Sequence, residues 1–161
     1  MKLEDFPSLN VKPETKILIA LDISSSVMCD INFQKIYRYY LSQITEQIYN
    51  TNSKVKILAF DTEIFKIHDY EYKNILDLVD FHYHVKNIHG GGTALDPVYK
   101  YNTESKFNAD HIVIMTDGYL NVEDYKQYSE NSYFVIIGQE NDYTFEHMKK
   151  LGLKYISAYI N

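Results

Sequence analysis

The sequence predicts an α/β fold with a doubly wound, mainly parallel central sheet, one antiparallel edge strand and helices on both faces. Two short apolar runs, residues 16–21 and 111–116, have the near-continuous hydrophobic pattern of strands that are buried on both faces. Residues 33–49 carry apolar side chains at spacings of three and four, which is typical of an amphipathic helix. Because predicted strands alternate with predicted helices, the sheet is expected to be mostly parallel.

The remaining elements follow from local patterns and turn residues. Further strands are expected at residues 54–60, 64–67, 133–137 and 155–158, and further helices at 72–79, 96–101, 122–128 and 145–150. The polar break at residues 61–63 is short, so the strand after it is expected to return as an antiparallel edge strand. Asp96 is the expected N-cap of its helix because Pro97 follows it.

Length and composition indicate one domain. The 161 residues, of which 45% are hydrophobic and 24% charged, suit a compact domain with its own core. Residues 1–15 are expected to form a polar N-terminal arm, and residues 16–161 the domain itself. The net charge of −6 and a single arginine, Arg38, argue against nucleic-acid binding, because phosphate backbones require a face rich in Lys and Arg.

The apolar stretches are too short for a membrane protein or a signal peptide, so a cytoplasmic protein without a membrane partner is expected. The longest stretch, residues 17–21, falls far short of the roughly 20 residues that cross a bilayer. The single cysteine, Cys29, agrees with a reducing compartment. We expect it to be a small buried residue rather than a reactive thiol.

Oxygen donors follow two of the predicted buried strands. The first strand ends in Asp22-Ile-Ser-Ser-Ser, and the strand from residue 111 ends in Thr-Asp-Gly at residues 116–118. Ligands of doubly wound sheets bind at the carboxyl ends of the strands, an edge that we call the crest. Carboxylates and hydroxyls suit Mg²⁺, Ca²⁺ or Mn²⁺ better than the metals that prefer thiolate or imidazole. A divalent cation is therefore expected on the crest.

With the loop His89-Gly-Gly-Gly-Thr93, these motifs resemble the metal-ion-dependent adhesion site of von Willebrand factor type A (VWA) domains. The resemblance covers residues 16–158. Through the stretch 59–64 and the three glycines, it is strongest to the VWA-like domains that lie behind predicted metallopeptidase domains in bacteria. It implies five metal-site residues: Asp22, Ser24, Ser26, Thr93 and Asp117.

The family pattern also implies which of the five residues contact the ion directly and which act through water. The positions of Ser24, Ser26 and Thr93 contact the ion, whereas those of Asp22 and Asp117 act mainly through bound water. The sequence departs from the commonest pattern at residue 25, a serine where relatives often have glycine. It departs again at residue 96, where an aspartate falls three residues after the threonine rather than closer.

The resemblance implies a protein-binding module whose cation accepts an acidic group from a protein partner. Mg²⁺ is the first choice of cation, with Mn²⁺ and Ca²⁺ as alternatives, and relatives suggest a MoxR-type AAA+ ATPase or a larger assembly as partner. An alternative is a metal-assisted phosphohydrolase or other hydrolase that uses Asp22, although the sequence contains no phosphate loop and no serine elbow. A third alternative is a scaffold in which the cation only stabilises the loops.

Four features also have a purely structural interpretation. The Asp-x-Ser-x-Ser run could cap a helix instead of binding a metal. Asp61 either orients the site or serves the turn that contains it. The histidines His82, His84 and His89 suggest zinc, but structural or solvent-facing roles are favoured. The tyrosine cluster at residues 37–40 could stack on a partner, but core packing is favoured at helical spacing.

Overall fold

A computed structural model describes residues 2–69, 93–118, 126, 128–138 and 143–160. Within these ranges six strands form one sheet: β1 (Lys16–Asp22), β2 (Lys54–Phe60), β3 (Ile64–Asp69), β4 (His111–Thr116), β5 (Ser132–Ile137) and β6 (Lys154–Ala158). Their order is β3-β2-β1-β4-β5-β6, and every neighbouring pair is parallel except β2 and β3. The predicted fold class is confirmed, and the strand ends differ from the predicted ones by at most two residues.

β1 lies in the middle of the sheet because its residues are apolar on both faces. From Ile17 to Leu21 every side chain is at most 1% exposed. Ile17, Ile19 and Leu21 belong to one core cluster, whereas Leu18 and Ala20 belong to the cluster on the opposite face. β2 and β4 pair with β1 in parallel register, one on each side. The two cores therefore meet at this strand.

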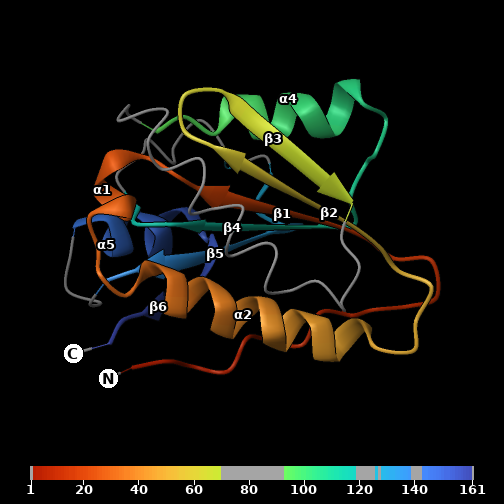
Figure 1. Cartoon of the computed structure of the whole chain (residues 1–161), viewed down its shortest axis with the longest axis horizontal. Helices are drawn as coiled ribbons and strands as arrows, with labels where there is room; N and C mark the ends of the chain where they lie inside the picture. Colours follow the sequence, from red (N-terminus) through yellow and green to blue (C-terminus); the bar gives the residue numbers. More distant parts are fainter. Residues whose placement is uncertain (1, 70–92, 119–125, 127, 139–142, 161) are drawn as a thin grey trace.

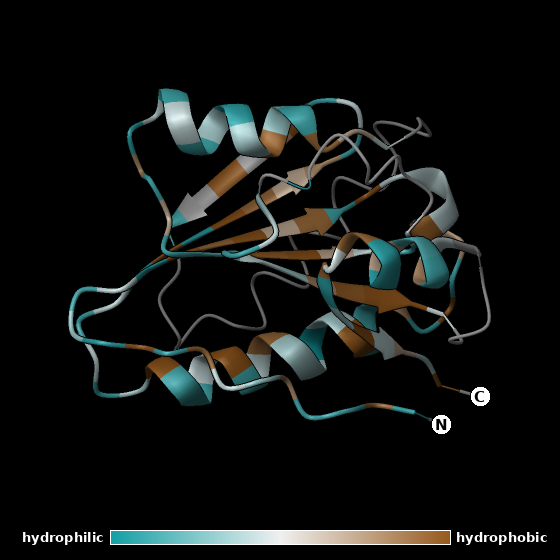
Figure 2. Ribbon diagram, turned by 180° about the vertical axis from the view of Figure 1, so that it is seen from behind, coloured by the Kyte–Doolittle hydropathy of each residue, from teal (hydrophilic) through white to brown (hydrophobic). Residues whose placement is uncertain are grey.

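Helices cover both faces of the sheet (Figure 1). α2 (Phe33–Ile48) packs on one face, where Tyr40 is buried in the same cluster as Ile19. α4 (Asp96–Glu104) and α5 (Tyr143–Leu151) contribute to the cluster on the other face. Figure 2 shows the apolar strands enclosed between helices that carry polar residues as well as apolar ones. Among the described residues, no helix combines the length and the apolar character that crossing a membrane requires.

β3 is the antiparallel edge strand that the sequence predicts. It pairs with β2 from Lys56 opposite Asp69 to Phe60 opposite Ile64, and the register shifts between Ala59 and Phe60. A shift of this kind bends and twists an edge strand, which makes further strand pairing at that edge less favourable.

The N-terminal arm is part of the core. Phe6 and Leu9 are 6% and 3% exposed and lie in the cluster that α2 covers. Their backbone N–H groups donate to the side-chain amide oxygens of Gln43 and Gln47. The arm therefore depends on two apolar residues too widely spaced to produce a periodic pattern in the sequence.

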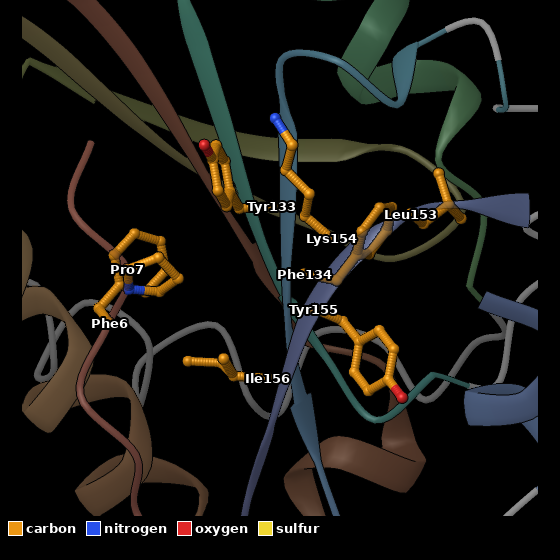
Figure 3. Close-up of a pocket in the computed structure, with 8 residues that line it drawn as sticks. All are labelled: Phe6, Pro7, Tyr133, Phe134, Leu153, Lys154, Tyr155 and Ile156. Carbon is orange, nitrogen blue, oxygen red and sulfur yellow. The ribbon is translucent and has the colours of Figure 1, made fainter. Parts of the chain in front are cut away.

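A hollow of about 350 Å³ lies where the arm meets the outer edge of the sheet. Figure 3 shows Phe6 and Pro7 of the arm beside residues of β5 and β6, with Lys154 among a mostly apolar lining. Lys2 forms an isolated antiparallel bridge with Tyr159, just beyond β6. Because β4 and β5 separate β6 from β1, this hollow is distant from the predicted metal site.

Three local predictions differ from the structure. A one-turn helix, α1 (Ser25–Met28), follows β1 and was not expected. The N-cap of α4 is Leu95, so Asp96 is the first residue within the helix, where a carboxylate interacts favourably with the helix dipole. Cys29 is exposed, not buried, because it ends α1 on the surface.

Truncation of the arm's main anchor should destabilise the protein. Phe6→Ala is expected to lower the free energy of unfolding by about 3 kcal/mol, because the change leaves a cavity beside α2. Ile31→Ala is the matched control, since it shortens a side chain that is 91% exposed and should cost less than about 0.5 kcal/mol. Urea unfolding followed by circular dichroism measures both, and equally small effects would show that the arm adds nothing to the core.

Candidate functional site

The predicted metal-site residues lie where β1 and β4 end, at the centre of the sheet. β1 ends at Asp22 and β4 ends at Thr116, and the two strands are neighbours. β2 lies on the far side of β1 and β5 on the far side of β4, so the direction of winding reverses between them. Such a switch point is the usual ligand site of open α/β sheets. In Figure 1 it lies at the end of the sheet where β1 leads into α1.

The carboxylate of Asp22 connects three segments of the crest. Its side chain is buried, with 0% exposure. Oδ1 accepts the backbone N–H of Ser24 at 2.8 Å. Oδ2 accepts the hydroxyl of Thr116 at 2.6 Å and that of Thr93 at 3.4 Å. One charged group thus joins the loop after β1, the end of β4 and the segment that leads into α4.

Burial raises the pKa of Asp22 from 3.8 to about 6, because removal from water disfavours the charged form. Hydrogen bonds from Thr116 and Ser24 oppose this effect, whereas the nearby negative charge of Asp117 adds to it. Near pH 7 the folded protein therefore holds a buried, ionised carboxylate close to a second acidic side chain. A cation at this position would offset the cost of burying that charge.

Ser24 and Ser26 approach each other in the loop after β1, with their Oγ atoms 3.3 Å apart. Ser24 is the N-cap of α1, yet its side chain makes no capping hydrogen bond. Asn32, the N-cap of α2, makes none either, so the interpretation of this motif as a set of helix caps is wrong. Ser24 is 1% exposed whereas Ser26 is exposed, so the pair offers one buried hydroxyl and one hydroxyl at the surface.

Thr93 brings the end of the glycine-rich loop to the crest. It is half-buried, and its hydroxyl points to Asp22 Oδ2. The next residue, Ala94, donates its backbone N–H to the backbone carbonyl of Asp61 at 2.9 Å, which fixes the segment against the end of β2. The rest of the loop, residues 89–92, lies outside the described residues.

Asp117 follows β4 and is half-buried. Its charge contributes to the raised pKa of both Asp22 and Tyr37, which places it beside the same site. The turn after it requires glycine, since Gly118 has a φ of +84° and a Cβ there would lie 3.0 Å from the methyl group of Thr144. Gly118 thus permits a sharp turn directly after Asp117, and this turn keeps Asp117 at the crest.

Two residues that the sequence did not assign to the site hold it together. Thr116 donates the shortest of the side-chain hydrogen bonds to Asp22. Tyr37, on α2, is 2% exposed and donates its hydroxyl to the backbone carbonyls of Asp22 at 2.8 Å and Met115 at 3.2 Å. Core packing is confirmed for Tyr37 and Tyr40, but no local pattern distinguishes the tyrosine that also ties β1 to β4.

Asp61 serves the turn between β2 and β3. Its Oδ1 accepts the backbone N–H groups of Thr62 and Glu63 and the Thr62 hydroxyl, so the turn interpretation is confirmed. Its side chain is nevertheless buried, at 1% exposure. In the part of the chain that the structure describes, Oδ2 has no hydrogen-bond partner.

Several predicted features fall outside the described residues. They are the three histidines His82, His84 and His89 and the helices at 72–79 and most of 122–128. Within the described ranges, no three His, Cys, Asp or Glu side chains are grouped so that they could hold a metal ion. A cation on the crest would therefore rely on hydroxyl oxygens as well as carboxylates, as the adhesion-site pattern implies.

Comparisons with known proteins agree with this fold. The model of the Ro60 vWA domain family matches residues 16–129. The chain is also similar to the crystal structure of an aerotolerance-related membrane protein from Bacteroides fragilis with multiple mutations to serines, at 16% identity, a TM-score of 0.59 and coverage of 91% of this chain and 92% of that one. BatB from Bacteroides thetaiotaomicron aligns at 18% identity and a TM-score of 0.62, over 91% of both chains.

The VWA domain of SpRpn10 aligns at 11% identity with a TM-score of 0.62, over 92% of this chain and 89% of that chain. No curated protein matches the sequence. At these identities the structural likenesses show the fold alone. The resemblance to VWA domains is confirmed, whereas the metal-ion-dependent adhesion site and the finer likeness to metallopeptidase-associated domains stay predictions.

Loss of the Tyr37 hydroxyl should loosen the crest. Tyr37→Phe is expected to lower the free energy of unfolding by about 2 kcal/mol, because two buried carbonyls lose a donor. Tyr39→Phe is the matched control, since that hydroxyl donates to an exposed carboxylate, Asp5, at 3.4 Å, and not to buried backbone carbonyls as Tyr37 does. Urea unfolding of both variants checks the difference, and similar losses would contradict the role of Tyr37.

The stability of the metal-free protein should fall as pH rises from about 4 to about 6. The pKa of Asp22 is higher in the folded protein than its ordinary value, so the folded state binds the proton more tightly than the unfolded chain. The resulting stabilisation, about 3 kcal/mol, is complete below about pH 4 and is lost as pH rises through 6. Asp22→Asn removes the titration.

Urea unfolding in EDTA at a series of pH values measures this effect. Wild-type stability should decline relative to the Asp22→Asn variant across that range and then run parallel to it above about pH 7. The slope of the free energy of unfolding against pH does not depend on any pH-independent loss of stability that the substitution causes. Parallel profiles throughout the range would show that Asp22 is not destabilised by its surroundings.

Proposed function

Because this chain belongs to the Ro60 vWA domain family, we propose that it is a protein-binding module that recognises an acidic group of its partner through a divalent cation on the crest. VWA domains are typically protein-interaction modules. In this proposal Ser24, Ser26 and Thr93 contact the ion directly, and Asp22 and Asp117 act through water. Mg²⁺ is the first candidate, with Mn²⁺ and Ca²⁺ as alternatives.

The observation that carries the proposal is the buried carboxylate of Asp22 among hydroxyl groups. It accepts hydrogen bonds from Ser24, Thr93 and Thr116. The negative charge of Asp117 lies near it and raises its pKa further. Two acidic groups near a buried position repel each other unless a positive charge lies between them. A divalent cation with hard oxygen ligands fits this donor set.

The same ligands favour an acidic partner. The three proposed direct ligands are neutral hydroxyls, and the two carboxylates are proposed to act through water, so no carboxylate of this chain would contact the ion directly. Divalent cations of this class bind carboxylate oxygen strongly. Ser26 is exposed and Thr93 is half-buried, which leaves one side of the site open toward a partner. A MoxR-type AAA+ ATPase as that partner stays a prediction from the family resemblance.

The environment of Asp22 favours binding over hydrolysis. A nucleophilic or basic carboxylate needs an oxygen that can reach the substrate. Asp22 is 0% exposed, and both of its oxygens accept hydrogen bonds from the crest. Metal-dependent turnover of phosphate or carboxylate esters that is lost in Asp22→Asn would favour the hydrolase alternative instead.

Added Mg²⁺ should stabilise the protein. At a concentration about 100 times its dissociation constant, a bound ion contributes about 2.7 kcal/mol, which raises the melting temperature by about 5 °C or more over EDTA. Ser24→Ala and Thr93→Val are expected to remove most of this rise. Differential scanning fluorimetry with Mg²⁺, Mn²⁺, Ca²⁺ and EDTA measures it.

Ser25→Ala is the matched control for the metal experiment. Ser25 is an exposed serine that lies between the two proposed ligands but is not one of them, so this variant should keep the full rise. Identical melting in EDTA and in all three metals would remove the metal proposal. An equal loss of the rise in Ser25→Ala would show that the loop, and not the ligand oxygens, determines the response.

Partner capture separates a binding module from a scaffold. The immobilised wild-type protein should retain its partner in Mg²⁺ and release it in EDTA, whereas Asp117→Ala should not retain it in either buffer. Retention that is unaffected by EDTA and by Asp117→Ala would show that the cation stabilises the loops without bridging to the partner. Quantitative mass spectrometry of the retained proteins gives the comparison.

A further inference from the structure

A groove of about 630 Å³ lies at the end of the sheet opposite the crest. The amino-terminal ends of β1 and β2, the carboxyl end of α4 and the loop after α4 form it (Figure 1). Four lysines line it: Lys16, Lys54, Lys56 and Lys106. They are 4 of the 16 basic residues in a chain with a net charge of −6, and Asp69 is the one acidic residue among the described residues of the lining. The groove is thus a positively charged surface on an acidic protein.

The lysines continue a face of the sheet that is otherwise apolar. Leu18 and Leu58 are buried in the cluster beneath α4. Side chains two positions apart on a strand point to the same face. Lys16 therefore lies on the same face as Leu18, and Lys54 and Lys56 lie on the same face as Leu58, each nearer the amino-terminal end of its strand. The apolar face therefore becomes a charged face where α4 ends.

Two of these lysines lie side by side. The parallel register of β1 and β2 places Lys16 opposite Lys54, and neighbouring strands are about 4.8 Å apart. Among the described residues, neither of these ammonium groups nor that of Lys106 forms an ion pair. Adjacent like charges destabilise the folded state, and an anion bound between them would remove the repulsion.

The other side of the groove is preorganised. Lys56 donates to Asp69 at 2.8 Å, and its ammonium group lies 5.6 Å from the centre of the Phe107 ring. Phe107 is flanked by Lys106 and Asn108, whose φ angles are +59° and +49°. A left-handed backbone costs a non-glycine residue about 1 kcal/mol, so the rest of the fold holds this loop in place. The loop thus presents a lysine and an aromatic ring to the groove.

We propose that this groove binds an extended acidic segment of a protein partner, with acidic residues at alternate positions. Lys16 and Lys54 lie opposite each other on neighbouring strands, about 4.8 Å apart, and their long, flexible side chains can spread further. Acidic side chains at alternate positions of an extended peptide repeat at about 6.6 Å, so each can pair with one of these two lysines. Phe107, 8% exposed, and Tyr101, half-buried, offer apolar contact to the methylene groups of these acidic side chains.

The type of charge favours a carboxylate-rich peptide over a nucleic acid. Lysine binds either carboxylate or phosphate as a point charge, whereas the planar, bidentate recognition of phosphate requires arginine. The one arginine of the chain, Arg38, lies on α2, on the other face of the sheet. The net charge of −6 would also repel a phosphate backbone that extends beyond the groove.

A fluorescein-labelled peptide, Gly-Glu-Phe-Glu-Ile-Glu-Gly, tests the proposal by fluorescence anisotropy at low salt. The wild-type protein is expected to bind it, and the double variant Lys16→Gln/Lys54→Gln to bind it about tenfold more weakly. Lys35→Gln is the matched control, because it removes the same charge from an exposed position on α2 and should change affinity less than about twofold. EDTA and Asp22→Asn should have no effect, so failure of the cation proposal would leave this result unchanged.

Melting temperature distinguishes a ligand site from a structural role for these lysines. The double variant removes a pair of like charges and should melt at the same or a higher temperature, so weaker binding with a melting point several degrees lower would overturn the proposal. Equal binding of the isomer Gly-Phe-Ile-Glu-Glu-Glu-Gly, or of a short RNA oligonucleotide of equal charge, would also overturn it. So would an equal loss of binding in Lys35→Gln, or no binding of the peptide to the wild type.

Discussion

The buried carboxylate of Asp22 organises the loops of the crest. Ser24 donates to it from the adjacent loop, and Thr93 and Thr116 donate from segments 71 and 94 positions away. In surroundings that exclude water these hydrogen bonds are strong, and the loss of one leaves a buried charge with less compensation. Tyr37 adds a second support, since its hydroxyl bonds the backbone carbonyl of the same aspartate. The geometry of the site and the affinity for a cation that we propose for it therefore share one physical origin.

A mainly parallel sheet also separates two kinds of chemistry. Residues that follow the parallel strands collect at one end of the sheet, and residues that precede them collect at the other. Here the first end carries carboxylates and hydroxyls, whereas the second carries Lys16 and Lys54 in register. β1 has seven residues and therefore six steps of about 3.3 Å, so the two ends are about 20 Å apart. Partner segments at the crest and at the basic groove would not compete for space.

Sequence periodicity predicted most of the fold because strands buried on both faces of a parallel sheet appear in the sequence as continuous apolar runs. The runs at residues 16–21 and 111–116 became β1 and β4, and the polar break at residues 61–63 became the turn of the antiparallel edge. Predictions from local sequence failed for the N-terminal arm and for the start of α4. Phe6 enters the core because α2 lies beneath it, and Leu95 replaces Asp96 as the N-cap because α4 begins one residue earlier than the proline suggests.

The sequence by itself determined the succession of the strands along the chain, and through the family resemblance it suggested the five residues of the proposed metal site. Hydrophobic pattern and oxygen-donor motifs are local properties, and both can be read along the chain. Only the tertiary structure decided that Thr93 reaches Asp22 across 71 positions, that Tyr37 ties β1 to β4, and that two lysines stand side by side at the opposite end. Those contacts depend on strand order and register, which arise from the packing of the whole sheet and which no local pattern encodes.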